Sequence, residues 1–142
     1  MLLVDARGVP LSLIVTGANR HDVSQLVPVL DAIINPRPEP CAQPCEHLCA
    51  DAAFTGQPAD QAIRERRYTP HVRSRGEERH RRIEGYKPRR WVVEVAHSWF
   101  NRFRKLLVRY EKLHRSFVAL NMLAAAIICF RHVPAKVNII YG

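Results

Sequence analysis

The stretch HLCADAAFTG, residues 47–56, decides how the middle of this chain folds. It is an apolar run that ends on one acidic residue, Asp51, and turns at Gly56. A short apolar run between turn signals is typical of a strand buried on both faces. Ligands of mixed α/β sheets collect at the carboxyl ends of strands, which makes Asp51 a candidate site residue. A turn-forming aspartate is the alternative interpretation.

The beginning of the chain predicts a β-hairpin. Residues 1–5 are apolar up to Asp5, DARG supplies turn chemistry, and VPLSLIVT, residues 9–16, has strand-like content. Asp5 therefore belongs to the hairpin tip, at the far end of its strands from a site built at Asp51.

A helix is expected after the hairpin. Asp22, followed three residues later by Gln25, forms a capping-box pattern. The apolar face of this helix consists of Leu26, Leu30 and Ile33. Pro28 should distort its first turns, because proline lacks a backbone donor and crowds the preceding turn. Residues 35–46 are rich in proline and predict a loop.

The segments after Gly56 continue the alternation of helix and strand. Pro58 suits the first turn of a helix that runs to about Arg67, and YTPHV, residues 68–72, predicts a strand whose Pro70 indicates a sheet edge. Two helices should follow, at about 89–110 and 114–131. The order β-β-α-β-α-β-α-α predicts a mixed α/β fold with helices flanking the sheet.

The stretch RRWVVEVAHSWFNRFRKLLVRYEK, residues 89–112, has two contrasting faces. Its apolar stripe, predicted to be core, consists of Val92, Val95, Trp99, Phe103, Leu106 and Tyr110. The opposite face gathers Glu94, His97, Asn101, Arg104 and Lys105. Glu94 is a candidate site residue because it is one acid among many cations. A polyanion bound by those cations would meet Glu94, and a metal ion would relieve the repulsion between carboxylate and phosphate. The alternatives are a solvated Glu94, and stacking of Trp99 and Phe103 on unpaired bases.

Charge predicts a nucleic-acid partner. The chain has 142 residues, 47% of them hydrophobic, which suits one domain, and its net charge is +9 with a pI of about 10.0. Residues 64–90 contain 11 Lys and Arg but only 4 Glu, so this segment supplies +7 of the net charge of +9. The residues expected to contact DNA phosphates are Arg73, Arg75, Arg79, Arg81, Arg82, Arg89, Arg90, Asn101, Arg102, Arg104 and Lys105.

No signal peptide or membrane span is predicted. The start MLLVDARG has neither a charged n-region nor a long apolar stretch, and MLAAAIICF is too short for a bilayer, so a cytoplasmic location is expected.

Cys41, Cys45 and Cys49 with His47 form a candidate zinc cluster. Pro44 and the strand position of Cys49 favour reduced, structurally ordinary thiols instead.

Four motifs together carry a family resemblance. VTGANRHD, CADAAFTG, YTPHVRSRGEE and residues 89–112, in this order, resemble the catalytic region of a DDE transposase from a bacterial insertion sequence. The resemblance implies a ribonuclease H-like fold in which two Asp and one Glu bind two Mg²⁺ ions that cleave and rejoin DNA. By position, Asp51 is similar to the second Asp and Glu94 to the Glu.

The resemblance also implies what else the enzyme needs. The family's first Asp lies on a strand before the opening hairpin, so we expect a partial catalytic domain over residues 1–131, truncated at the N-terminus with its first strand missing. Residues 132–142 would form a tail. The metal site would be incomplete and the chain alone inactive, either through decay or as the downstream half of a frameshifted enzyme. Insertion-sequence ends and target DNA would be its partners, a homo-oligomer is conceivable, and a non-enzymatic basic nucleic-acid-binding protein is the alternative.

Overall fold

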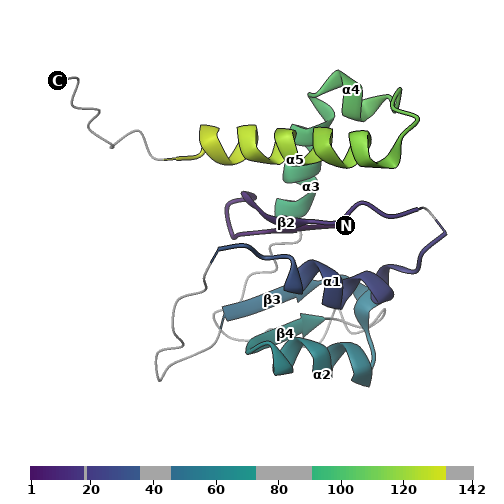
Figure 1. Cartoon of the computed structure of the whole chain (residues 1–142). Helices are drawn as coiled ribbons and strands as arrows, with labels where there is room; N and C mark the ends of the chain where they lie inside the picture. Colours follow the sequence, from purple (N-terminus) through teal and green to yellow (C-terminus); the bar gives the residue numbers. More distant parts are fainter. Residues whose placement is uncertain (18, 36–45, 73–90, 134–142) are drawn as a thin grey trace.

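A computed structural model describes residues 1–17, 19–35, 46–72 and 91–133 (Figure 1). The elements are β1 (Leu2–Val4), β2 (Pro10–Leu13), η1 (Asp22–Gln25), α1 (Leu26–Asp31), β3 (Glu46–Ala50), η2 (Ala52–Phe54), α2 (Gln57–Glu65), β4 (Tyr68–Val72), α3 (Trp91–Asn101), α4 (Arg104–Leu107) and α5 (His114–Arg131). This order confirms the mixed α/β class. In Figure 1 the β1–β2 hairpin lies between α5 and a unit made of α1, α2, β3 and β4.

The predicted hairpin is confirmed. β1 and β2 pair antiparallel with Leu2 opposite Leu13, and the register shifts between Leu3 and Val4. The turn is held by Asp5, whose Oδ1 accepts hydrogen bonds from the backbone N–H groups of Arg7 at 2.8 Å and Val9 at 2.9 Å. Asp5 therefore has a structural task at the tip, as its position in the sequence indicates.

The described strands form two separate sheets and not one. β3 and β4 pair in parallel from Glu46 opposite Tyr68 to Ala50 opposite Val72, with α2 as the crossover, while β1 pairs with β2. The expectation of a single mixed sheet is therefore wrong for these residues. β1 and β3 do not pair, and residues of both strands, Leu2, Leu3, Leu48 and Ala50, line a pocket.

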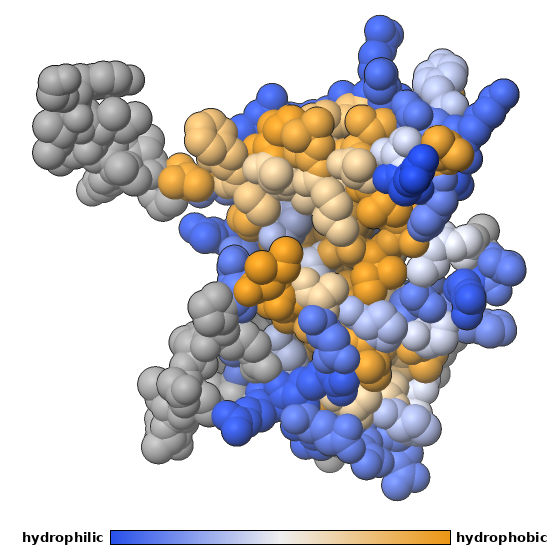
Figure 2. Space-filling model, viewed as in Figure 1, coloured by the Kyte–Doolittle hydropathy of each residue, from blue (hydrophilic) through white to orange (hydrophobic). Residues whose placement is uncertain are grey.

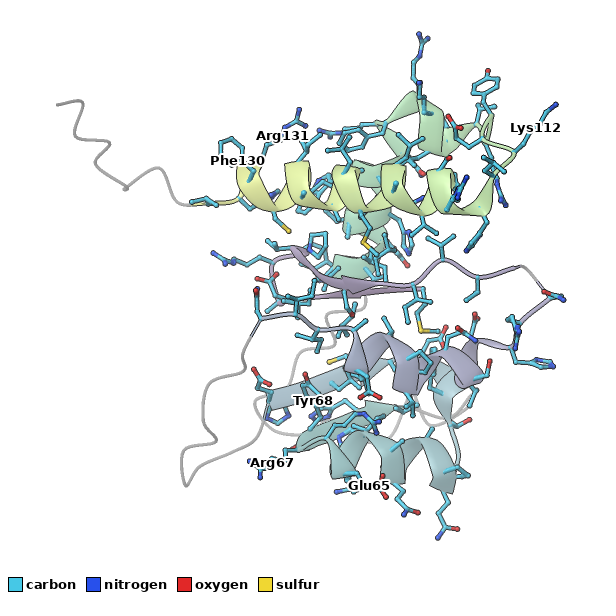
Figure 3. All side chains as sticks on the ribbon, viewed as in Figure 1. Glu65, Arg67, Tyr68, Lys112, Phe130 and Arg131 are labelled. Carbon is cyan, nitrogen blue, oxygen red and sulfur yellow. The ribbon has the colours of Figure 1, made fainter. Side chains whose placement is uncertain are left out.

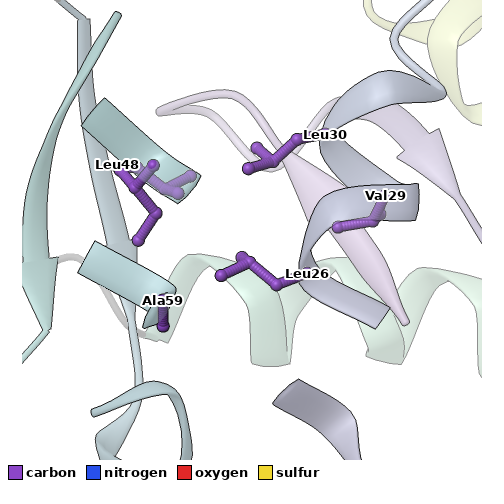
Figure 4. Packing of buried hydrophobic residues seen from close by; sticks show 6 residues of the cluster. Leu26, Val29, Leu30, Leu48 and Ala59 are labelled. Carbon is purple, nitrogen blue, oxygen red and sulfur yellow. The ribbon is translucent and has the colours of Figure 1, made fainter. Parts of the chain in front are cut away.

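One hydrophobic core joins α1, α2 and β3. It consists of Leu26, Val29, Leu30, Leu48, Ala59 and Ile63 (Figure 4). Leu26 and Leu30 are buried as predicted, but Ile33 is only half-buried and Val29 takes its place. Ser12 Oγ donates to the Val29 carbonyl at 2.6 Å, which ties the hairpin to α1.

The capping box predicted at Asp22 is absent. η1 is a 3₁₀ turn preceded by His21, and no side chain caps either η1 or α1. The His21 carbonyl instead accepts from the Ser24 backbone N–H at 3.0 Å and from Ser24 Oγ at 2.7 Å. The turn before Pro28 is thus 3₁₀, in agreement with the predicted distortion.

The helix α2 ends close to the predicted residue. It stops at Glu65, and Arg67 follows with a φ of 61°, the left-handed conformation that often ends a helix. Figure 3 labels Glu65, Arg67 and Tyr68 along this turn into β4. Arg66 Nε and Nη2 donate to the two carboxylate oxygens of Asp31 at 2.7 and 2.9 Å, so the same turn is fastened to α1.

The single helix predicted for residues 89–110 is wrong. α3 ends at Asn101, Phe103 is extended with a φ of −86° and a ψ of 100°, and the short α4 follows. The residues buried on α3 are Val92, Ala96 and Phe100. Val92 is therefore buried as predicted, but Ala96 and Phe100, outside the predicted stripe, are buried too, because α3 packs against both β1 and α5. The other stripe residues are half-buried, except Tyr110, which is exposed.

The last predicted helix is confirmed as α5. Ala124 and Ile128 of α5 pack with Phe100 of α3 in a second core, next to Leu2 and Leu13 of the hairpin. Within the described residues, no helix combines the length and the apolarity that crossing a membrane would require.

Candidate active site

Asp51 and Glu94 line one pocket. It has a volume of about 380 Å³ and lies between the hairpin, β3 and α3. Its wall is largely apolar, with Met1, Leu3, Leu26, Leu48, Phe54 and Val93 among the lining residues. The structure therefore brings together the two carboxylates that the sequence singled out, from elements far apart in the chain.

Asp51 directly follows β3, as predicted, and the interpretation as a turn-forming aspartate is confirmed. It is the N-cap of η2, and its Oδ1 accepts a hydrogen bond from the Ala53 N–H at 2.8 Å. The side chain is also exposed to the pocket, and in the described part of the chain its Oδ2 accepts no hydrogen bond. A carboxylate fixed through one oxygen presents the other in a defined direction.

Glu94 lies in the first turn of α3 and is exposed. Its own helix does not bury it, as its position opposite the apolar residues predicts. Among residues 1–17, 19–35, 46–72 and 91–133 no cation lies within ion-pair distance of its carboxylate. The amino-terminal end of the helix stabilises a negative charge there.

Asp22 and His97 line the same pocket, and the sequence analysis missed both as site residues. Asp22 begins η1, which packs against η2, directly after Asp51. Asp22 lies well beyond the end of β2 at Leu13, so it lacks the strand-end position that marks Asp51, and only packing brings it to the pocket. His97 lies one turn beyond Glu94 on the polar face of α3.

The electrostatics of the pocket favour a neutral His97. Partial burial lowers the pKa of His97, and the ammonium group of Met1 lowers it further. Burial likewise lowers the pKa of the Met1 amino group, and the nearby Asp22 carboxylate opposes this shift. The Met1 ammonium also donates to the Ile14 carbonyl at 2.6 Å. The charge of the Met1 amino group thus interacts with both Asp22 and His97.

The donor atoms of this pocket suit a hard divalent cation only in part. Carboxylate oxygens are the ligands that Mg²⁺ prefers. However, no three His, Cys, Asp or Glu side chains of the described segments gather closely enough to hold a metal ion. Asp51 and Glu94 therefore offer suitable oxygens but no complete coordination shell.

Two members of the candidate zinc cluster, Cys41 and Cys45, lie outside the described residues. Cys49, on β3, is half-buried and forms no disulfide within the described residues. His47 stacks on His71 of β4, with ring centroids 4.7 Å apart. The Nδ1 atom of His47 lies 2.5 Å from Nε2 of His71, so its nearest ring partner comes from the neighbouring strand.

The candidate DNA-contacting residues divide into two groups. Arg73, Arg75, Arg79, Arg81, Arg82, Arg89 and Arg90 lie outside the described residues. The others are exposed at the junction of α3 and α4, which we call the basic corner: Asn101, Arg102, Arg104 and Lys105. Asn101 is two helical turns, about 10 Å, beyond Glu94 along α3.

Comparison with known proteins defines the class. A family model described as "Transposase DDE domain" matches residues 48–131, which include the end of β3, Asp51, Glu94 and α5. The chain belongs to this family of DDE transposases. It is 36% identical over 125 residues to a Burkholderia cepacia protein named "Putative transposase for insertion sequence element IS402". The match covers 84% of this chain and 57% of that relative, so the chain spans little more than half of the relative's length. No solved structure matches the chain.

Proposed function

We propose that this chain is part of a DNA transposase in which Asp51 and Glu94 bind catalytic divalent ions. The observation that supports the proposal is their meeting at one pocket, within the segment that matches the transposase domain. The fixed Asp51 and the unpaired Glu94 are positioned to serve as oxygen ligands. Divalent ions held by these two carboxylates would supply Lewis acidity to a phosphodiester undergoing cleavage.

The pocket also suggests what completes the site. β1 and β3 line opposite sides of it and do not pair with each other. In the proposed ribonuclease H-like arrangement, a further strand carrying an aspartate lies between them and joins the two small sheets into one. This strand would come from the portion of a longer transposase that the chain does not span, so we propose that the chain alone does not cleave DNA.

The basic corner extends this proposal to the DNA substrate. The basic corner lies at the other end of α3 from Glu94. A DNA duplex whose scissile phosphate contacts Glu94 can therefore extend along α3 to Arg102 and Lys105. Insertion-sequence ends and target DNA are the proposed substrates, and the cytoplasm, where bacterial DNA lies, is the proposed location. If the metal site is never completed, non-enzymatic DNA binding is what remains.

Metal binding is tested on the chain as it exists. Thermal unfolding is measured with Mg²⁺ and Mn²⁺ for the parent, Asp51→Asn and Glu94→Gln. The parent should gain a few degrees at saturating Mn²⁺, because a ligand that binds only the folded state stabilises it, and each variant should lose this gain. The matched control is Asp60→Asn, an exposed carboxylate of α2 that pairs with Arg64 at 2.6 Å. An equal gain in all variants would contradict the assignment.

Catalysis is tested by a nicking assay on duplex DNA with Mn²⁺. We expect no cleavage by the present chain and metal-dependent cleavage by a protein extended with the upstream coding sequence. In the extended protein, Asp51→Ala and Glu94→Ala should each abolish cleavage. If the present chain cleaves DNA and Asp51→Ala abolishes this cleavage, the proposal that its metal site is incomplete is wrong. If the extended protein still cleaves DNA with Glu94→Ala, Glu94 has no part in the mechanism.

A further inference from the structure

Two histidines meet on one face of the β3–β4 pair. Leu48 of β3 is buried in the core, so its neighbours His47 and Cys49 point to the opposite face of the strand. His71 of β4 lies opposite Cys49 in the register, and its own neighbour Val72 packs against the core. His47 and His71 therefore share the face that is turned away from the core, where His47 is exposed and His71 is half-buried.

The two imidazole rings are in direct contact. Nδ1 of His47 lies 2.5 Å from Nε2 of His71, and the ring centroids are 4.7 Å apart. Two ring nitrogens do not turn their lone pairs toward each other at this distance unless a hydrogen atom or a cation lies between them, because the lone pairs repel. One imidazole that donates to the other provides such a hydrogen atom. The separation is nevertheless shorter than the roughly 2.7–3.2 Å of ordinary hydrogen bonds from nitrogen.

We propose that His47 and His71 together bind one transition-metal cation of the zinc class, in place of the hydrogen atom that joins them. Zinc binds imidazole nitrogens at about 2.0–2.1 Å, and a tetrahedral geometry places two such nitrogens about 3.3 Å apart. The pair reaches this separation by opening about 0.8 Å from 2.5 Å, which small side-chain rotations supply. The ring that carries the shared hydrogen changes its tautomer, so that both facing nitrogens offer a lone pair to the ion.

Water completes the coordination shell of this ion. In the part of the chain that the structure describes, no third His, Cys, Asp or Glu gathers with the two histidines, so the site has two protein ligands. On the face turned to the viewer in Figure 2, hydrophilic residues cover the end of the molecule formed by α2, whereas apolar residues gather over α5. β3 and β4 lie at this hydrophilic end in Figure 1. Because His47 is exposed, an ion bound to it remains within reach of water.

The histidine pair differs from the carboxylate pocket in chemistry and in position. Imidazole nitrogens suit Zn²⁺, Ni²⁺ and Cu²⁺, whereas the oxygens of Asp51 and Glu94 suit Mg²⁺ and Mn²⁺. Neither His47 nor His71 is among the described residues that line the pocket of Asp51. An ion held by both rings joins β3 to β4 and so stabilises the strand that ends at Asp51. The inference does not depend on the proposed catalysis.

Nuclear magnetic resonance of the imidazole nitrogens of the full chain tests the site in a titration with Zn²⁺. The resonances of His47 and His71, assigned through His47→Gln and His71→Gln, should shift together and saturate at the same Zn²⁺ concentration, because one ion contacts both rings. Each substitution should raise the dissociation constant seen at the remaining ring about tenfold or more. His114, an exposed histidine of α5, is the internal control and should not follow this curve. Unshifted resonances, or a remaining ring that keeps its parental affinity, would overturn the proposal.

Thermal unfolding separates this ion from those of the carboxylate pocket. Saturating Zn²⁺ should raise the melting temperature of the parent, because a ligand that binds only the folded state stabilises it. His47→Gln should reduce this gain and Asp51→Asn should retain it. If Asp51→Asn loses the gain and His47→Gln keeps it, Zn²⁺ binds in the pocket and the proposal is wrong. In Cys49→Ser the Zn²⁺-induced shifts of His47 should persist, and their loss would assign the ion to the cysteines instead.

Discussion

Trp99 of α3 packs against Gly8 in the hairpin turn so closely that a Cβ on Gly8 would lie 3.3 Å from the indole Cη2 atom. Gly8 also has a φ of +89°, a conformation that side chains rarely adopt. The indole also packs against the ring of His132, with ring centroids 4.4 Å apart. Trp99 thus connects the hairpin tip to the end of α5, and so holds the hairpin that forms one wall of the pocket.

Gly8→Ala should destabilise the protein by about 1–2 kcal/mol from the backbone conformation alone, with a further loss as Trp99 shifts. Urea unfolding of the parent and the variant measures the difference. Gly17→Ala is the matched control, because a Cβ there would meet only the movable end of Asn19. Equal effects of both substitutions would contradict the role of the Gly8 contact.

Trp99→Ala should lower the free energy of unfolding by roughly 2–3 kcal/mol, less than the 3–5 kcal/mol typical of a fully buried tryptophan, because Trp99 is half-buried. Unfolding monitored by circular dichroism is the measurement, combined with binding of single-stranded DNA. Should the variant keep its stability and lose single-strand binding, Trp99 would be a base-stacking residue and not a packing residue.

Glu94→Gln should lower the melting temperature in the absence of divalent metal by about 1–4 °C, because the amino-terminal end of α3 stabilises the negative charge of Glu94. Asp51→Asn should leave the melting temperature nearly unchanged, because asparagine retains the ability to cap η2. The measurement is a thermal scan in chelator. A larger fall for either variant would show that its carboxylate is needed to stabilise the fold, which argues against a role in binding a cation.

The basic corner should contribute to DNA affinity through phosphate contacts. Replacing Arg102, Arg104 and Lys105 together by Gln should weaken duplex binding and reduce the slope of log affinity against log salt by about 0.9 per lost contact. Fluorescence anisotropy at several salt concentrations gives both values. Arg64→Gln on α2 is the control, as Arg64 is already paired with Asp60. An unchanged slope would show that the corner is only a solvated surface.

His97 should make stability depend on pH. Its pKa is lowered in the folded protein, so the unfolded chain binds the proton more readily, and stability should fall as pH drops below the ordinary value of about 6.5. His97→Gln should reduce this dependence between about pH 5 and 7, measured by urea unfolding. Ser98→Ala changes the same helical turn without removing a titratable group and should leave the dependence as it is.

Much of the fold was predictable because its signals are local. Strand pairs and helix ends depend on neighbouring residues, and the hairpin, the strands β3 and β4 and the helix α5 all agree with the sequence patterns. The break at Phe103 was not predictable, since the apolar period continues through it. On the buried face of α3 only Val92 was predicted, because the burial of Ala96 and Phe100 depends on packing against other elements, which the sequence does not show.

The sequence by itself determined which chemistry the site offers. Asp51 at the end of an apolar strand and Glu94 opposite an apolar stripe were both recognisable, because local periodicity fixes where each side chain points. Only the tertiary structure decided that the two carboxylates share a pocket, that Asp22 and His97 join them, and that β1 and β3 remain apart. Those relationships depend on how the hairpin, β3 and α3 pack in space, and the spacing of residues along the chain does not contain that information.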